Sequence, residues 1–285
     1  MFKQISSLLK LRIGVIMMFT ALAAMTVTPG PSLTGFEAFV LAFAVLVAAG
    51  SAGAFNQYYE VDLDSLMQRT RNRPFVTGRF HKSALWIVFM LLLLIAGVAS
   101  SALVLNGATA IYIFLGAFFY AVVYTVWLKR RTWLNIVIGG ASGSFAVLAG
   151  AAAVDPSMSP VPILLALVLF FWTPSHFWSL AIAKHQDYVN AGVPMLPVVV
   201  GDKRTAMVVM ANTLVLVTIS ILPVFYGLSW IYFIAASAGG GYFIYRNYQM
   251  VLDPSPKIAI KSFLASLVQL IFVMLGAVLD TTLLG

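Results

Sequence analysis

The chain has 285 residues, of which 61% are hydrophobic and only 9% are charged, and its formal net charge is +8. Together with a mean hydropathy of +0.98, this composition excludes a soluble domain and indicates a polytopic membrane protein. The chain contains no cysteine, which excludes disulfides, thiolate metal sites and cysteine nucleophiles.

Nine apolar segments follow one another along the chain, and most approach the ~20 residues that a spanning helix needs. They run over approximately 12–28, 36–55, 84–105, 108–127, 135–154, 161–182, 206–226, 228–245 and 261–283. The eighth is the least regular, because it is short and contains Gly239, Gly240 and Gly241. The sequence therefore predicts an all-α integral membrane protein in which residues 1–285 form one domain of nine transmembrane helices.

The first segment also resembles a signal peptide, with basic residues before it and Ala21, Ala23 and Ala24 behind it. Because the predicted topology needs this segment as a span, we expect an uncleaved first helix. No long Arg- and Ser-rich presequence precedes it, which disfavours an organelle import signal.

All 17 lysines and arginines fall at the N-terminus or in every second loop. They are Lys3, Lys10 and Arg12; Arg69, Arg71, Arg73, Arg79 and Lys82; Lys129, Arg130 and Arg131; Lys184, Lys203 and Arg204; and Arg246, Lys257 and Lys261. By the positive-inside rule the N-terminus is cytoplasmic, and the C-terminus is outside after nine crossings. This rule explains the basic net charge better than nucleic-acid binding does. We expect a multi-pass protein of a bacterial inner membrane.

Charged side chains are concentrated between Asn56 and Pro74, in the first of two long loops on the cytoplasmic side (about 56–83 and 183–205). On a helix, Asn56, Glu60 and Asp64 recur at i, i+4 and i+8 and share one face, whereas Asp62 points elsewhere. Such oxygen ligands suit Mg²⁺, which binds through one or two carboxylates plus substrate phosphates. The arginines that follow are suited to grip phosphate oxygens. The alternative is a solvated loop of mixed charge.

The second loop carries Lys184 and Asp187 and emerges on the same membrane face. If the two loops converge, Asp187 completes a site for metal and diphosphate, with Lys129, Arg130 and Lys184 adding positive charge. Each of these basic residues is alternatively only a topology determinant. No GxxxxGK or HExxH motif and no nucleophile–base–acid triad is found, so hydrolases and nucleotide-driven pumps lose support.

His176 lies inside the sixth apolar segment, beside Trp172, Phe177 and Trp178. A buried histidine satisfied by a neighbour is the ordinary interpretation. A polar residue among aromatic side chains inside a span is also what a flat aromatic or porphyrin substrate would meet. The sequence leaves both interpretations open.

At this point the sequence resembles a known family, the UbiA-type intramembrane prenyltransferases, and among them the protohaem IX farnesyltransferases (haem O synthases). The resemblance is carried by Asn56-x-x-x-Glu60-x-Asp62-x-Asp64-x-x-Met67-x-Arg69-Thr70-x-x-Arg73-Pro74, Leu128-Lys129-Arg130-Arg131-Thr132, Trp172-Thr173-Pro174-x-His176-Phe177-Trp178 and Asp187-Tyr188-x-x-Ala191-Gly192-Val193-Pro194-Met195-Leu196-Pro197. The acidic motif alone marks only the superfamily. The RTxxRP and AGVPMLP segments mark the haem branch.

The resemblance implies nine helices around a central, laterally open cavity and a Mg²⁺-dependent transfer of farnesyl from farnesyl diphosphate to the 2-vinyl group of protohaem IX, with addition of water. It implies metal binding by Asn56, Glu60, Asp64 and Asp187, with Asp62 joining the catalytic acids. It further implies that Arg69, Arg73, Lys129, Arg130, Lys184 and Tyr188 contact diphosphate or haem propionates, and that His176 lies near the haem. Many relatives carry two aspartates in the second loop where this chain has only Asp187, so a second Mg²⁺ is not assigned.

An allylic cation needs aromatic walls without competing nucleophiles, and the candidates are Tyr58, Tyr59, Tyr120, Tyr124 and Trp178. Two other functions stay open. The first is a related prenyltransferase acting on a quinone precursor such as 4-hydroxybenzoate. The second is a haem carrier or assembly factor without catalysis. Association with a haem A synthase or with terminal-oxidase assembly is also left open.

Overall fold

The computed structural model describes residues 2–284, and every regular element in that range is helical. The α-helices are α1 (Phe2–Leu8), α2 (Leu11–Val27), α3 (Gly35–Tyr59), α4 (Val61–Leu66), α5 (Ala84–Val104), α6 (Gly107–Phe118), α7 (Asn135–Gly139), α8 (Ala141–Val154), α9 (Pro160–Ala183), α10 (His185–Asn190), α11 (Leu196–Val200), α12 (Asp202–Ile221), α13 (Trp230–Leu252) and α14 (Pro256–Leu284). Two further helices are the π-helix η1 (Phe119–Leu128) and the 3₁₀-helix η2 (Leu222–Tyr226). The all-α prediction is confirmed.

Within residues 2–284, seven helices are long and apolar enough to cross a membrane. They are Gly35–Tyr59, Ala84–Val104, Gly107–Leu128, Asn135–Val154, Pro160–Ala183, Asp202–Tyr226 and Pro256–Leu284. The two other predicted spans fall on α2, an apolar helix of 17 residues, and on α13, a helix of 23 residues. The total of nine crossings and the orientation of the termini stay predictions.

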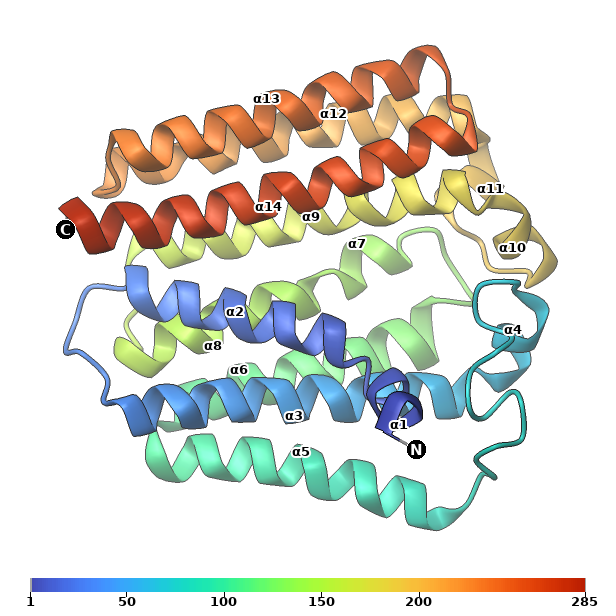
Figure 1. Ribbon diagram of the computed structural model, residues 1–285, viewed down its shortest axis with the longest axis horizontal. Coiled ribbons are helices and arrows are strands. Elements are labelled where there is room, and N and C mark those ends of the chain that lie inside the picture. Colours follow the sequence, from blue (N-terminus) through green and yellow to red (C-terminus); the bar gives the residue numbers. More distant parts are fainter. Residues whose placement is uncertain (1, 285) are drawn as a thin grey trace.

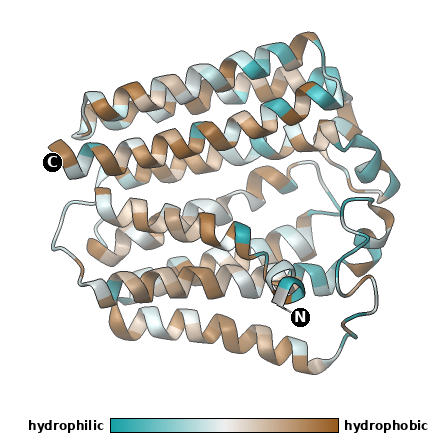
Figure 2. Ribbon diagram, viewed as in Figure 1, coloured by the Kyte–Doolittle hydropathy of each residue, from teal (hydrophilic) through white to brown (hydrophobic). Residues whose placement is uncertain are grey.

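The long helices lie side by side in one bundle, with α9, α12, α13 and α14 in one group and α2, α3, α5 and α6 in the other (Figure 1). Helices α8 and α2 join the groups, since α8 packs on both α2 and α9 while α2 also contacts α14. The short helices α1, α4, α10 and α11 gather at one end, and α14 ends at the opposite end (Figure 1). Hydrophilic residues concentrate around these short helices (Figure 2).

Small residues bring α8 close to α2 and make room beside α3, as membrane helices generally require. A Cβ on Gly150 of α8 would lie 1.9 Å from the carbonyl oxygen of Ala21 in α2, so these two backbones are in direct contact. A Cβ on Gly53 would meet the side chain of Lys10 at 3.3 Å. The small residues at the end of α3 therefore serve packing, and Gly53 makes room for a lysine.

The end of α6 widens into the π-helix η1, in which the N–H of each residue bonds five residues back. The last such bond joins the Lys129 N–H to the Tyr124 carbonyl at 2.9 Å. The rings of Tyr120 and Tyr124 stack in this segment with their centroids 5.6 Å apart. The π-helix thus holds two tyrosines and Lys129 at the hydrophilic end of the bundle.

Candidate functional site

The three groups predicted to share a face lie where α3 passes into α4. The helical hydrogen bonds continue through this junction, because Glu60 N–H donates to the Asn56 carbonyl (3.0 Å) and Asp64 N–H donates to the Glu60 carbonyl (2.8 Å). This continuity keeps the helical phase. Asn56, Glu60 and Asp64 are accordingly buried, at 2%, 0% and 2% exposure. We call these three residues the acidic stripe.

Every member of the acidic stripe receives a hydrogen bond from a cation. The bonds run from Lys129 Nζ to Glu60 Oε2 (2.5 Å), from Arg73 to Asp64 Oδ2 (2.6 Å) and from Lys10 Nζ to Asn56 Oδ1 (2.6 Å). Arg73 and Lys129 were predicted to contact diphosphate, and the structure brings both to the stripe. Cations and oxygen ligands thus meet at a buried site, where charges interact more strongly than in water.

Lys10 was expected only to set topology, and the structure instead places it in the site. Its ammonium donates to Tyr120 Oη (2.7 Å) as well as to Asn56. Burial, and after it the nearby Arg73, holds the pKa of Lys10 well below its usual value. Lys10 is 46 residues from Asn56 and 110 from Tyr120 in the chain. No local pattern carried that information, although Tyr120 itself was named among the aromatic candidates.

Asp62, predicted among the catalytic acids, lies away from the acidic stripe. Its side chain is 61% exposed and forms a bidentate pair with Arg130, at 2.7 and 2.8 Å. The hydrogen bond from Arg130 is the main cause that lowers the pKa of Asp62, and the same bond raises the pKa of Arg130. The pair ties α4 to the segment that follows η1.

The two predicted loops converge, since Asp187 of α10 accepts a hydrogen bond from the backbone N–H of Gln68 (3.1 Å). Asp187 and Tyr188 are both buried. Tyr188 Oη lies 3.5 Å from the guanidinium of Arg69, at the outer limit of a hydrogen bond. Lys184 is exposed beside them, where it lines a second pocket together with Gln68 and Asp187. The second loop thus packs against the first, which is the condition that a shared site requires.

The site fits Mg²⁺ in its donor chemistry. In the part of the chain that the structure describes, no three His, Cys, Asp or Glu side chains form a group able to hold a metal by themselves. Mg²⁺ needs fewer, because it keeps waters and takes one or two carboxylates plus substrate phosphates. The second carboxylate oxygen of Glu60, Oε1, is buried without a hydrogen-bond partner. A buried oxygen without a partner costs free energy of folding, and a bound metal ion or water would remove that cost.

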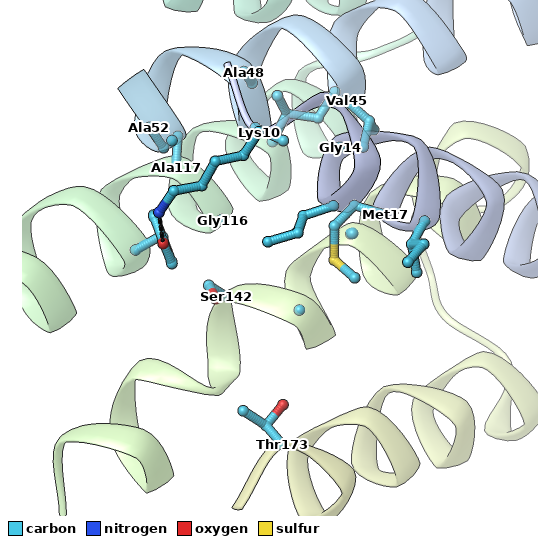
Figure 3. Close-up of a pocket in the computed structure, with 18 of the residues that line it drawn as sticks. Lys10, Gly14, Met17, Val45, Ala48, Ala52, Gly116, Ala117, Ser142 and Thr173 are labelled. Atoms are coloured by element: carbon cyan, nitrogen blue, oxygen red, sulfur yellow. Dashed lines mark hydrogen bonds between the residues drawn. The ribbon is translucent and has the colours of Figure 1, made fainter. Parts of the chain in front are cut away.

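An apolar cavity of about 220 Å³ opens beside the acidic stripe, lined by residues of α2, α3, α6, η1, α8, α9 and α14. Figure 3 shows Lys10 along one wall near Ala48 and Ala52, with Ser142 and Thr173 on the opposite side. Of the predicted aromatic walls, Tyr120 lines this cavity. Tyr58 packs on Phe75 and Trp178 on Trp133 instead. The arrangement gives an apolar chain a place directly next to a charged head-group site.

His176 also lines the cavity, and its ring lies flat between Trp172 and Phe263, with centroid distances of 4.1 and 4.3 Å. Its Nδ1 is 2.6 Å from Ser266 Oγ. The same hydroxyl oxygen lies 2.6 Å from the Phe263 carbonyl oxygen, so Ser266 joins the imidazole to the backbone of α14. The two interpretations of His176 are therefore compatible: a neighbour satisfies one nitrogen, and the residue faces the cavity.

Comparisons with known proteins agree with this geometry. The UbiA prenyltransferase family profile matches residues 17–274. The chain is 50% identical over 283 residues to Protoheme IX farnesyltransferase 2 of Paramagnetospirillum magneticum, covering 99% of this chain and 98% of that protein.

Two solved structures share the fold. A UbiA homologue from Aeropyrum pernix has a TM-score of 0.78 and 22% identity over 95% of this chain and 98% of that one. A UbiA homologue from Archaeoglobus fulgidus bound to DMAPP and Mg²⁺ has a TM-score of 0.70 and 16% identity over 96% and 99% of the two chains. The buried acidic stripe, the cations that bond it and the adjoining apolar cavity thus lie in a protein that belongs to the UbiA prenyltransferase family, on its protohaem IX farnesyltransferase branch.

Proposed function

We propose that this protein transfers the farnesyl group of farnesyl diphosphate to the 2-vinyl group of protohaem IX, with addition of water, giving haem O and diphosphate. The observation that carries the proposal is the acidic stripe with its three cations at the end of an apolar cavity. Such a site receives a molecule with an anionic head and an apolar tail. The name of the 50% identical relative, Protoheme IX farnesyltransferase 2, supports farnesyl as the transferred group and protohaem IX as the acceptor.

The chemistry begins with cleavage of the bond between C1 of the farnesyl group and the diphosphate oxygen, and the electron pair leaves with diphosphate. Lys129, Arg73 and Arg69 stabilise the negative charge that develops there. When bound, Mg²⁺ supplies Lewis-acid stabilisation of the same leaving group. Asn56, Glu60, Asp64 and Asp187 would hold it. The structure of a related protein with DMAPP and Mg²⁺ supports the use of a divalent metal.

The allylic cation is then attacked by the vinyl π electrons of protohaem, which forms a carbon–carbon bond and leaves a cation beside the porphyrin ring. Water adds to that cation and loses a proton. Tyr120 and Trp172 give the cavity aromatic surface, which stabilises cations without reacting with them. We place protohaem against His176, and we assign Lys184 and Tyr188 to the rim that contacts diphosphate or propionates. Asp62 and Arg130 serve by fixing α4 in place.

We further propose a single domain over residues 1–285 in a bacterial inner membrane, with α4, α10 and α11 at the cytoplasmic face. Support comes from the gathering of hydrophilic residues at that end of the bundle (Figure 2) and from the positive-inside rule. Association with a haem A synthase or with terminal-oxidase assembly is compatible with this orientation.

The test uses the purified protein in detergent with protohaem, farnesyl diphosphate and Mg²⁺, followed by mass spectrometry of the extracted haem. The expected product has gained one farnesyl group and one water, and EDTA abolishes it. If 4-hydroxybenzoate were prenylated while protohaem stayed unmodified, the acceptor would be a quinone precursor and not protohaem. Haem that is bound but never modified, with either acceptor, would favour a carrier.

A further inference from the structure

Lys10 occupies an unusual backbone position between α1 and α2. Its φ of 48° and ψ of 42° place it in the left-handed region, which residues other than Gly, Asn and Asp seldom adopt. Such a conformation costs free energy and persists where surrounding contacts over-determine it. The contacts here are those of the side chain, whose stem lies over Gly53. The break between the two helices therefore directs the lysine inward.

The ammonium of Lys10 is held only by neutral groups. It donates to Asn56 Oδ1 (2.6 Å) and Tyr120 Oη (2.7 Å), and it lies 5.2 Å from the centre of the Tyr120 ring. Among residues 2–284 it forms no ion pair, because the neighbouring carboxylates of Glu60 and Asp64 are paired with Lys129 and Arg73. A partly buried charge is normally paired. The cations Lys10, Arg73 and Lys129 thus outnumber the two carboxylates, Glu60 and Asp64, with which they are grouped.

Lys10 also stands at a boundary. It lines the apolar cavity, and of the described residues it is the one Lys, Arg, Asp or Glu that does so. Its amino group meanwhile touches the acidic stripe. Figure 3 shows the side chain running along the cavity wall to its bond with Tyr120, drawn as a dashed line. The ammonium of Lys10 therefore lies where the cavity meets the acidic stripe.

We propose that Lys10 is a substrate-binding residue, whose ammonium holds an anionic oxygen of a substrate at the boundary between the apolar cavity and the acidic stripe. This inference rests on the proposed function, which offers two sources of such an oxygen: the diphosphate of the prenyl donor and a propionate of the haem acceptor. Tyr120 and Asn56 hold the ammonium in place until that oxygen arrives. A purely structural role, in which Lys10 only ties α2 to α3, is the alternative.

The experiment compares steady-state kinetics of wild type, Lys10→Gln, Lys10→Arg and a matched control, Arg12→Gln. Arg12 is an exposed cation two residues away at the same end of the protein. A hydrogen bond to a charged group is worth a factor of roughly 10 to 100 in affinity. We expect Lys10→Gln to raise one KM by that factor, Lys10→Arg to restore most of it, and Arg12→Gln to leave both KM values unchanged.

The substrate whose KM rises identifies the source of the oxygen. If the KM of farnesyl diphosphate rises and inhibition by inorganic pyrophosphate weakens in parallel, Lys10 binds the donor. If the KM of protohaem rises, Lys10 binds a propionate. Protohaem dimethyl ester checks the second case. Esterification removes the propionate charge, so it should raise the KM of the haem substrate for the wild type and leave that of Lys10→Gln unchanged. A lower kcat with both KM values unchanged, or a folded Lys10→Arg enzyme without rescue, would overturn the proposal.

A second measurement keeps the proposal testable if Lys10→Gln does not fold. In the wild-type protein, modification of Lys10 by an amine-reactive reagent is followed by peptide mass spectrometry, with exposed Lys3 as the internal control. Inorganic pyrophosphate or protohaem should protect Lys10 and leave Lys3 unchanged. Equal labelling of Lys10 with and without each ligand would contradict anion binding. Protection by pyrophosphate in a protein that makes no haem O would instead refute the proposed reaction and retain the binding role.

Discussion

At the scale of single residues, the site depends on charges that are buried in pairs. Glu60 is fully buried, bonded to Lys129 through Oε2 at 2.5 Å and unpartnered at Oε1. Glu60→Gln keeps the shape and one oxygen but removes the charge. We expect kcat to fall by about 100-fold or more, the usual loss when one fixed electrostatic group is removed. The loss is measured as the kcat of the variant purified in detergent, assayed over a range of Mg²⁺ concentrations.

A matched control for this variant lies on the same helix. Glu37 is half-buried at the other end of α3, where it completes a capping box with Thr34. Gln also serves at that position of a capping box, so Glu37→Gln should retain turnover within about twofold. Wild-type turnover by Glu60→Gln would refute the assignment of this carboxylate.

The contribution of the exposed Asp62–Arg130 pair to the stability of the fold should depend on pH. Because the pKa of Asp62 is lowered in the folded protein, its contribution is fully present above the unfolded value of about 3.9 and is lost as pH falls through the folded pKa. Exposure limits the contribution to about 1 kcal/mol or less. The Tm difference between wild type and Asp62→Asn should therefore be present at pH 7 and vanish in strong acid.

The control for the pH experiment is the double variant Asp62→Asn with Arg130→Gln. If the two side chains act only through each other, the double variant should unfold at nearly the same temperature as Asp62→Asn alone. A Tm difference that grew on acidification would contradict the lowered pKa.

At the scale of secondary-structure elements, the π-helix η1 is positioned by a glycine on α7. A Cβ on Gly139 would lie 2.8 Å from Tyr124 Cβ, closer than side chains tolerate. Gly139→Ala should therefore displace Tyr124 and, with it, the ammonium of Lys129 that lies 5.5 Å from its ring centre. We expect turnover to fall by about tenfold or more, since small displacements of charged groups in a site are costly.

The control for Gly139 is Gly241 of α13, whose added Cβ would meet nothing within 4 Å. Gly241→Ala should retain full activity and stabilise its helix slightly, because alanine favours helices by about 1 kcal/mol over glycine. Full turnover by Gly139→Ala would show that η1 adapts without moving the site.

At the scale of the whole molecule, a buried polar network joins α9, α12, α13 and α14. Ser175 of α9 contacts Thr213 and Asn212 of α12, and Asn247 of α13 bridges Thr213 to Ser262 of α14. Hydrogen bonds of this kind join helices inside a bilayer, where the hydrophobic effect between helices is weak. The network fixes α9 and α14, whose residues Trp172, His176 and Leu267 line the cavity.

Much of this architecture could be predicted from the sequence, for a physical reason. Lipid forces backbone N–H and C=O groups to bond within the segment, so a long apolar run has few structures open to it. The acidic stripe follows from helical periodicity alone. The role of Lys10 could not be predicted, because its partners are 46 and 110 residues away. The same holds for Ser266, which fixes His176 from 90 residues away, and for the π-helix, whose apolar sequence is compatible with an α-helix.

The orientation in the membrane is the largest prediction that remains. Helix α1 and the C-terminal end of α14 lie at opposite ends of the bundle (Figure 1), the arrangement that an odd number of crossings requires. The basic residues sit at the end with α1, so that end should face the cytoplasm. Alkaline phosphatase, which is active only outside, should be active when fused after Leu284. Fused after Asp253, between α13 and α14, it should be inactive. Equal activity of the two fusions would show that α14 does not cross, and the reverse pattern would invert the whole protein and place the acidic stripe outside the cell.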